Sequence, residues 1–241
     1  MTSIPSHPPR IAILNGSTRM NNNADGVTSW VQSRFSLLTQ GISISPPIII
    51  DLKGGTPPLP LGPITSPIAP LALPYIPGHK TNLDGTITWP YIDPRESQWS
   101  EIVQRLDGLV IVTPEYNKCI PGEVKNTIDH LYPEWEGLPI AVINFGGQGG
   151  DGCSQQMEVL LQAIKAKVVS AREISIVLPF GDYIAGMRRT KPEDELFKEY
   201  EGKLDGVVGR MVEAAAKRSV WNEERKKMAE MGKELHQTLG G

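Results

Sequence analysis

The chain has 241 residues and a formal net charge of −3, a length that suits one sizeable core, with or without an elaborated loop and tail. Because the chain has no general excess of basic residues, it lacks the field that attracts a phosphate backbone, so we expect no nucleic-acid partner. No stretch approaches the ~20 apolar residues that cross a bilayer, and no apolar core follows a basic start at the N-terminus. We therefore expect a cytoplasmic protein with no membrane partner.

The two cysteines, Cys119 and Cys153, are isolated and form no CxxC pair. They indicate neither a disulfide framework nor a zinc site, and we interpret them as structural or incidental thiols. The four histidines are scattered without ligand spacing, so we expect no metal.

Short β-type apolar runs alternate with helical patterns along the chain. The runs cover residues 10–14, 42–52, 109–113, 138–144 and 174–178. Helical patterns begin near residues 25, 96, 121, 154 and 192. This alternation predicts an α/β fold with a doubly wound parallel sheet and helices on both faces. We expect five strands in the flavodoxin-like order 2-1-3-4-5, with the second run, which holds Pro46-Pro47, as an irregular entry or an edge strand.

The domain organisation follows from two changes in composition. Residues 53–94 hold ten of the 21 prolines and show no sustained period, which predicts a long loop. This loop is either an insertion without a role or a cover over a neighbouring site or subunit contact. After Trp221 the chain becomes highly charged. We predict an N-terminal arm over residues 1–9, a single domain over 10–219 and a charged helix or tail over 220–241.

The loop after the first run is a candidate phosphate site. In an open parallel sheet, ligands bind beyond the carboxyl ends of the strands where the strand order reverses, here between the first and third strands. Ser17, Arg19, Asn22 and Asn23 lie in this loop, just before a helix. Hydroxyl, guanidinium and amide groups at a helix start suit a phosphate, although the same residues also favour an ordinary polar N-cap turn. There is no GxxxxGK motif, which excludes a nucleotide triphosphatase loop.

A second candidate loop follows the third run, with Pro114, Glu115, Tyr116 and Asn117 in succession. Such a loop offers an aromatic edge and consecutive backbone N–H groups to a planar ring; the alternative is a tight strand-to-helix turn. Glu115 could act as an acid or could be a turn residue that points to solvent.

The third candidate loop contains Gly147, Gln148 and Gly149 and matches the pattern GxGxxG. That pattern marks dinucleotide sites when it follows the first strand of a fold, with an acidic residue after the next strand. Here it follows the fourth run and lacks the acidic residue. We interpret the glycines as positions where the backbone approaches a flat ring closely.

Together these motifs resemble the NADPH-dependent FMN reductase family. The resemblance depends on residues 16–19 (GSTR), 113–117 (TPEYN) with 120–129 (IPGEVKNTID), and the Gly146-Gly147 loop, and it covers roughly residues 10–178. It implies bound FMN, NADPH or NADH as hydride donor, and a small acceptor such as a quinone, an azo compound or free flavin.

The resemblance also implies roles for the three loops. Ser17, Arg19 and the amides of Asn22 and Asn23 would bind the FMN phosphate, residues 114–117 would border the isoalloxazine, and residues 147–149 would lie at its pyrimidine end. Because the flavin itself carries the hydride, we assign no catalytic side chain. The helix after Pro121 resembles the family's dimer-forming element, which implies a homodimer or a dimer of dimers.

This sequence departs from the family at three places. Asn22 stands where members often carry a second basic residue, the proline-rich stretch is longer than usual, and the charged C-terminal segment has no counterpart. Two other functions stay open: a one-electron carrier of the flavodoxin type and a flavin-binding regulatory protein without turnover.

Overall fold

The computed structural model describes residues 7–20, 22–54, 59, 61–64, 80–82 and 86–239. The elements in chain order are β1 (Ile11–Asn15), α1 (Ala24–Leu38), β2 (Ile48–Asp51), β3 (Lys80–Thr81), β4 (Ile87–Thr88), α2 (Pro94–Gln104), β5 (Gly108–Pro114), α3 (Gly122–Asp129), a 3-10 helix (Pro133–Trp135), β6 (Pro139–Gly146), α4 (Asp151–Ala163), β7 (Lys167–Ser170), β8 (Ser175–Val177), a π-helical turn (Phe180–Ile184), a second 3-10 helix (Glu195–Tyr200) and α5 (Glu201–Leu239). Among the described residues, no helix is long and apolar enough to cross a membrane.

The central sheet is parallel, in the order β2-β1-β5-β6-β7, and β8 pairs with the far end of β6. The predicted order of the five runs is therefore confirmed, with β8 as the last run. β7 precedes this run and also pairs with β6, so the sheet has six strands where the sequence predicted five. The register shifts between Ile140 and Ala141. Beyond the shift, the buried side chain of Asn144 donates to Ala171 O (3.2 Å) between the two strands. This hydrogen bond holds β6 to the connection between β7 and β8.

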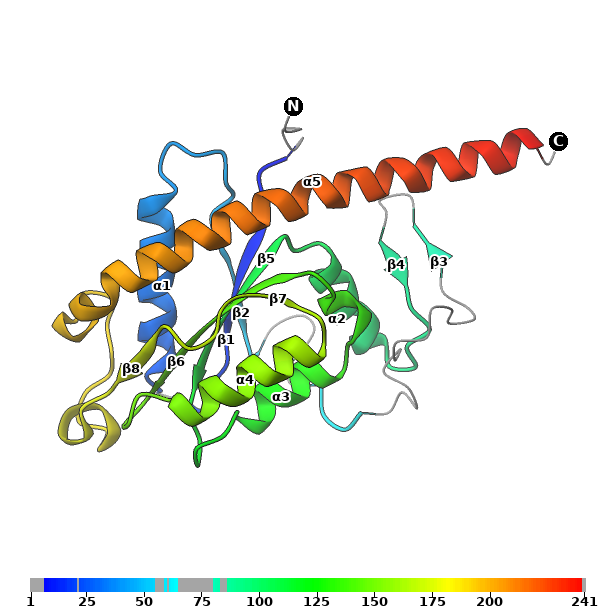
Figure 1. Cartoon of the computed structure of the whole chain (residues 1–241). Helices are drawn as coiled ribbons and strands as arrows, with labels where there is room; N and C mark the ends of the chain where they lie inside the picture. Colours follow the sequence, from blue (N-terminus) through cyan, green and yellow to red (C-terminus); the bar gives the residue numbers. More distant parts are fainter. Residues whose placement is uncertain are drawn as a thin grey trace.

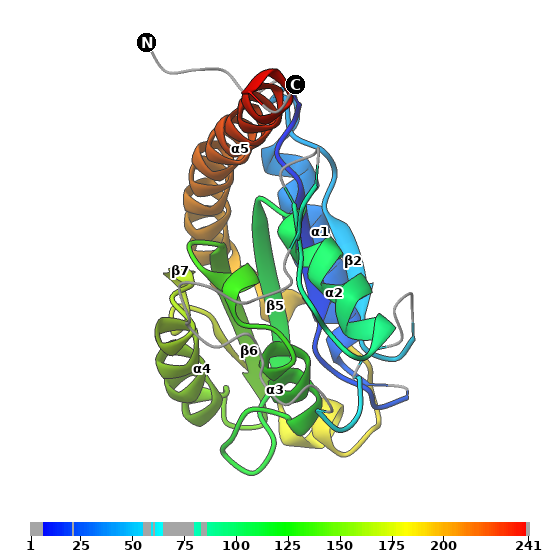
Figure 2. The same ribbon diagram turned by 90° about the vertical axis from the view of Figure 1, so that its right-hand side faces the viewer.

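Helices cover both faces of this sheet, α1 and α5 on one face and α2, α3 and α4 on the other (Figure 1 and Figure 2). Successive side chains of a strand point to opposite faces. Ile11 and Ile13 accordingly pack with α1 and α5, whereas Ala12 and Leu14 pack with the other three helices. This double burial explains why the runs of β1, β5 and β6 are continuously apolar.

The proline-rich stretch contains one feature that the sequence did not predict. β3 and β4 form a short antiparallel pair in which Lys80 lies opposite Thr88 and Thr81 opposite Ile87. Leu59 and Leu61 of the same stretch are buried in the core on the α2 side. The expectation that this stretch covers a neighbouring site concerns residues 55–58, 60, 65–79 and 83–85, which lie outside the described residues.

The closing helix begins later than its sequence pattern suggests. Residues near Pro192 form no α-helix; a 3-10 helix precedes α5, and its Phe197 stacks on Trp30 of α1 with ring centroids 4.6 Å apart. α5 then continues without a break to Leu239, and its charged second half extends beyond the sheet (Figure 1).

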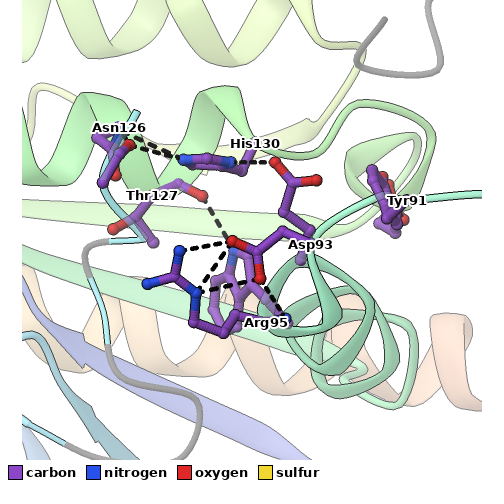
Figure 3. A network of polar contacts seen from close by, with 10 residues as sticks. Tyr91, Asp93, Arg95, Asn126, Thr127 and His130 are labelled. Atoms are coloured by element: carbon purple, nitrogen blue, oxygen red, sulfur yellow. Dashed lines mark hydrogen bonds and ion pairs between the residues drawn. The ribbon is translucent and has the colours of Figure 1, made fainter. Parts of the chain in front are cut away.

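A buried polar network joins α2 to α3 and to the 3-10 helix after it (Figure 3). Glu96 and His130 are buried, and Glu96 Oε1 lies 2.6 Å from His130 Nδ1. Glu134 is also buried, and its Oε1 accepts hydrogen bonds from Ser100 Oγ (2.5 Å) and Tyr91 OH (2.9 Å). Burial raises the pKa of the Glu134 carboxyl despite these hydrogen bonds.

This raised pKa predicts how stability changes with pH. Because the folded-state pKa of Glu134 lies above its unfolded value, its contribution is fully present below the unfolded pKa and is lost as the pH rises through the folded pKa. We expect Glu134→Gln to gain stability relative to the unmodified protein as the pH rises from about 4. Urea unfolding across pH checks this, with Glu136→Gln as an exposed control. A stability difference that does not change with pH would contradict the prediction.

Candidate functional site

A cavity of about 580 Å³ opens at the carboxyl edge of the sheet, beside the ends of β1 and β5. It lies where the strand order reverses, the place where open α/β sheets bind ligands. Nine of the eleven predicted binding residues line it: Ser17, Arg19, Asn22, Asn23, Pro114, Glu115, Tyr116, Asn117 and Gly147. Gln148 and Gly149 are not among the lining residues. The three predicted loops thus meet at one cavity.

The first and second loops contact each other through Tyr116. Ser17 Oγ lies 3.2 Å from Tyr116 OH, and the Arg19 guanidinium lies over the Tyr116 ring, 4.0 Å from its centroid. Thr18 Oγ1 donates to Glu123 Oε1 of α3 (3.1 Å). A hydroxyl and a guanidinium therefore face the cavity from a loop held against its neighbour.

The backbone of the first loop keeps donors available near the start of α1. Among the described residues, the N–H groups of Ser17 and Thr18 donate to no protein atom. Gly16 brings this loop against β5, because its N–H donates to Val112 O (2.8 Å) and a Cβ at this position would lie 2.8 Å from the same oxygen. N–H groups at a helix start are suited to an anion.

Asn22 and Asn23 have structural partners that the sequence did not reveal. Asn22 Nδ2 donates to Arg19 O, and its Oδ1 accepts from the N–H of Ala24 (2.6 Å), as in a helix cap. Asn23 Nδ2 donates to Tyr183 O (3.3 Å), and its Oδ1 accepts from the N–H of Thr190 (3.0 Å). Both amides line the cavity while holding the loop in shape.

The Glu115 side chain does not point to solvent, because only 8% of it is exposed. Its Oε2 accepts a hydrogen bond from the N–H of Cys153 (3.1 Å) in the first turn of α4, and its Oε1 lies 3.3 Å from Lys118 Nζ. A carboxylate at a helix start is stabilised by the helix dipole. Glu115 thus ties the second loop to the third.

Asn117 and Lys118 form a tight turn in which both residues have positive φ, 52° and 64°. Tyr116 and Cys119 exchange two backbone hydrogen bonds across it, of 3.2 and 2.9 Å. Two successive positive φ values are typical of a type I′ turn, which asparagine adopts readily. The turn therefore holds the backbone of Tyr116 in a fixed position just after the end of β5.

The glycines of the third loop serve a tight turn more than a flat ligand. Gly149 and Gly150 have φ of +90° and +120°, and a Cβ at Gly150 would lie 2.9 Å from Asn144 Cβ. Gly147 does line the cavity, and its N–H donates to no protein atom among the described residues. The loop therefore presents a backbone donor at Gly147 and turns away after it.

The segment after β8 forms a fourth wall of the cavity, which the sequence did not indicate. Its residues at the cavity are Leu178, Tyr183, Ile184, Ala185, Gly186 and Arg189. Tyr183 OH donates to Asp194 Oδ2 (3.0 Å), and Asp194 also pairs with Arg188. This segment follows the last strand, so its place at the same sheet edge could have been inferred from topology.

The two cysteines differ in accessibility. Both are free thiols; Cys119 is exposed and Cys153 is buried. Burial raises the pKa of the Cys153 thiol to about 12, so this thiol is unreactive at neutral pH.

The fold and the cavity at its switch point define a flavodoxin-like α/β protein with a ligand site at the carboxyl edge of the sheet. A family model described as "NADPH-dependent FMN reductase" matches residues 9–178. The chain belongs to this family, which confirms the resemblance seen in its motifs.

Individual relatives carry related names. The chain is 41% identical to the NAD(P)H-dependent FMN reductase LOT6 of Saccharomyces cerevisiae over 91 residues, 38% of this chain and 47% of that protein. It is 30% identical to the NAD(P)H-dependent FMN reductase ntnL of Nectria sp over 71% of this chain and 75% of that protein. A quinone reductase of Escherichia coli is 29% identical over 46% of this chain and 58% of its own. The matched segment thus spans about half the length of the yeast and E. coli relatives.

Solved structures of similar fold include FerB, a flavoenzyme NAD(P)H:(acceptor) oxidoreductase from Paracoccus denitrificans, with a TM-score of 0.51 and 22% identity over 85% of this chain and 97% of that one. An oxidoreductase from Corynebacterium diphtheriae has a TM-score of 0.53 and 16% identity over 88% and 99% of the two chains. At sequence identities this low, the similarity to these two structures shows a shared fold and nothing further.

Proposed function

We propose that this protein is an oxidoreductase that binds FMN non-covalently in the cavity at the carboxyl edge and passes hydride from NAD(P)H to a small acceptor such as a quinone, an azo compound or free flavin. The observation that carries the proposal is the convergence of the three predicted loops on one cavity. Family membership supports the same cofactor and donor. The FMN supplies the redox chemistry.

The cavity's donors fit the two ends of such a cofactor. The N–H groups of Ser17 and Thr18 at the start of α1, with the Arg19 guanidinium, would hold the phosphate. Tyr116 and the N–H of Gly147 would border the ring from the second and third loops. We also propose that Asn22 and Asn23 act through loop shape, because their amides are occupied by protein partners.

The protein's part in the reaction is to position and to polarise. Glu115 is held by Cys153 N–H and Lys118, so it keeps the second and third loops in register and is not available as a general acid. The N–H of Gly147 can stabilise negative charge that develops on the ring. The open side of the cavity admits donor and acceptor in turn, and we expect parallel initial-rate plots.

The phosphate assignment predicts the effect of changing Arg19. Removing one charge-assisted contact costs about 1.5–3 kcal/mol, so we expect Arg19→Ala to weaken FMN binding about 10- to 100-fold. Arg19→Lys keeps the charge but loses the planar stack on Tyr116. Its FMN affinity should lie between that of the unmodified protein and that of Arg19→Ala. Titration of apoprotein with FMN, followed by flavin fluorescence, measures this. Arg172→Ala, on a surface pair with Glu158, serves as control, and equal losses in Arg19→Ala and Arg172→Ala would refute the assignment.

The visible spectrum of the purified protein tests the whole proposal. We expect a bound-flavin spectrum that bleaches on addition of NADPH under nitrogen and returns when a quinone is added. Colourless protein that does not take up added FMN would overturn the proposal. Flavin that is bound but not reduced by NAD(P)H would indicate a regulatory protein, and a stable one-electron state in a redox titration would indicate a flavodoxin-type carrier.

We further propose that the protein is a cytoplasmic homodimer or dimer of dimers with residues 10–219 as one domain, flanked by an arm over 1–9 and a charged helical segment over 220–241. The exposed apolar side chains of Met20, which lines the cavity, and of Phe180 and Met187, in the segment after β8, support association, because a partner would cover them. A monomeric mass in solution at micromolar concentration would refute the dimer.

A further inference from the structure

A second cavity, of about 680 Å³, lies at the opposite edge of the sheet from the FMN cavity. Pro139 and Lys167, which begin β6 and β7, line it. In a parallel sheet the strand starts all lie at one edge, so this cavity shares no wall with the loops at the carboxyl ends. Nothing in the proposed hydride transfer uses it.

One face of α5 supplies most of the cationic wall. Ala214, Lys217, Arg218, Trp221 and Arg225 line the cavity at helical spacing. Lys167 adds a further cation from the start of β7. In a chain whose net charge is −3, such a concentration of positive charge in a concave site creates a local field that attracts anions.

Few acidic residues line this wall, although the charges of Asp107 and Glu136 act on Arg218. Glu136 is the single carboxylate that lines the cavity within the described part of the chain, and it already pairs with Lys165 (3.6 Å). Among the same residues, no carboxylate pairs with Lys167 or Arg218. Lys217 pairs with Glu213, whose carboxyl also lies within the field of Lys167 but is not among the residues that line this cavity.

Arg218 is held in place by the protein while part of its donor capacity stays unused. Its Nη1 donates to Glu136 O (3.1 Å), and a Cβ on Gly137 would lie 3.0 Å from the same nitrogen. Its Nε is buried and has no partner. Burial, and then the charge of Arg225, lower the pKa of Arg218 to about 10. The buried Nε is not accessible from the cavity, so an anion there would contact the terminal nitrogens of the guanidinium.

The same wall carries a flat aromatic surface. The guanidinium carbons of Arg218 and Arg225 lie 4.3 and 4.7 Å from the centroid of the Trp221 ring. Trp89 and Ile87, at the end of β4, form the facing apolar wall. Arginine stacked on an aromatic ring keeps its edge donors free for an anion, and its plane can stack on a planar ligand.

We propose that this second cavity is a binding site for a nucleotide: its phosphates contact Arg218, Lys217 and Lys167, and its base stacks against Trp221 and the arginines on it. The size is that of a small-ligand cavity, and the pairing of cations with indole and guanidinium planes matches a ligand that is both anionic and planar. A hydrated inorganic anion would use the cations but not the aromatic wall. A planar aromatic wall beside the cations favours a nucleotide over an acidic peptide, which carries no planar base.

Calorimetric titration of the FMN-loaded protein with ADP tests this proposal. Because the FMN cavity also admits NAD(P)H, which contains an ADP moiety, variants of the second cavity show which site ADP occupies. We expect saturable binding, with adenosine and pyrophosphate each at least about tenfold weaker, because each lacks one half of the contacts. Arg218→Gln should weaken the binding of ADP about tenfold or more and leave the affinity for FMN unchanged. Arg210→Gln, on the same helix but paired with Glu173, removes the same charge and should change ADP binding by less than about twofold.

Other outcomes would overturn the proposal. Absence of ADP binding would do so, as would equal losses in Arg218→Gln and Arg210→Gln, which would indicate a general charge effect. If pyrophosphate bound as tightly as ADP, the site would recognise phosphate alone and not a nucleotide. Binding of hexaglutamate without ADP would indicate an acidic protein partner instead. If Arg218→Gln unfolds, Lys167→Gln gives an independent measurement, because Lys167 begins a strand at the cavity rim and should weaken ADP about threefold or more.

Discussion

Replacing Gly26 by alanine should destabilise the protein by about 3 kcal/mol, although the same change in a helix ordinarily stabilises it by about 1 kcal/mol. Gly26 is buried in the first turn of α1. A Cβ on it would lie 2.0 Å from Thr190 O and 2.3 Å from Thr190 Oγ1. Real structures do not tolerate such distances, and the nearest atom belongs to the backbone, so α1 and the segment after β8 must move apart.

The separation would break the contacts that hold the fourth wall of the FMN cavity. Thr190 N–H donates to Asn23 Oδ1 (3.0 Å), and Thr190 Oγ1 donates to Asn23 O (2.7 Å). Both groups are buried, so their loss leaves unpaired polar atoms. We therefore expect Gly26→Ala to weaken FMN binding as well as folding, because Tyr183 and Arg189 lie on the displaced segment.

Gly209→Ala is the matched control for this prediction. Gly209 lies within α5, and a Cβ there meets no atom within 4 Å, so the change should stabilise the protein by about 0.5–1 kcal/mol. Urea unfolding measures both variants, and flavin fluorescence titration gives their FMN affinities. A Gly26→Ala protein as stable as the Gly209→Ala protein would show that the contact between Gly26 and Thr190 is not close in solution.

The parts of the fold that the sequence predicted share one property: their signal is local. The runs of β1, β5 and β6 are buried on both faces, so most of their residues are apolar, and the strand order follows from their alternation with helices. The loops with Ser17 and Tyr116 follow these strands directly, and the topology alone places them at one edge. The family motif 113–117 lies in the same loops.

The parts that the sequence did not predict depend on contacts between distant residues. Asn23 meets Thr190 across 167 positions, and no spacing within either segment announces that contact. Gly150 has a positive φ, and a Cβ on it would lie too close to Asn144 of the preceding strand, whereas the GxGxxG pattern that spans it suggested a ligand. β3 and β4 have only two residues each, too few for a period-two pattern to be detected.

The buried pair of Glu96 and His130 should show the second large effect. His130 Nδ1 faces Glu96 Oε1 at 2.6 Å, and His130 Nε2 faces Gly62 O at 3.1 Å (Figure 3). The pair therefore joins α2, the end of α3 and the segment that follows β2. Removing one partner of a buried ionic or hydrogen-bonded pair strands the other in a low dielectric, which costs about 3–5 kcal/mol.

We expect His130→Ala to lose stability in this range, because it removes the ring that faces the buried Glu96 carboxyl, although Gly62 O keeps its hydrogen bond from Asn126 Nδ2. Glu96→Gln keeps a hydrogen-bond acceptor of the same shape opposite the ring and should lose only about 1–2 kcal/mol. Asp129→Ala, one residue away, breaks the exposed pair with Lys125 and should cost about 0.5 kcal/mol or less. Urea unfolding measures all three. Equal losses in His130→Ala and Asp129→Ala would mean that the α2–α3 junction is hydrated, and the fold would then depend on its apolar layers alone at this end of the sheet.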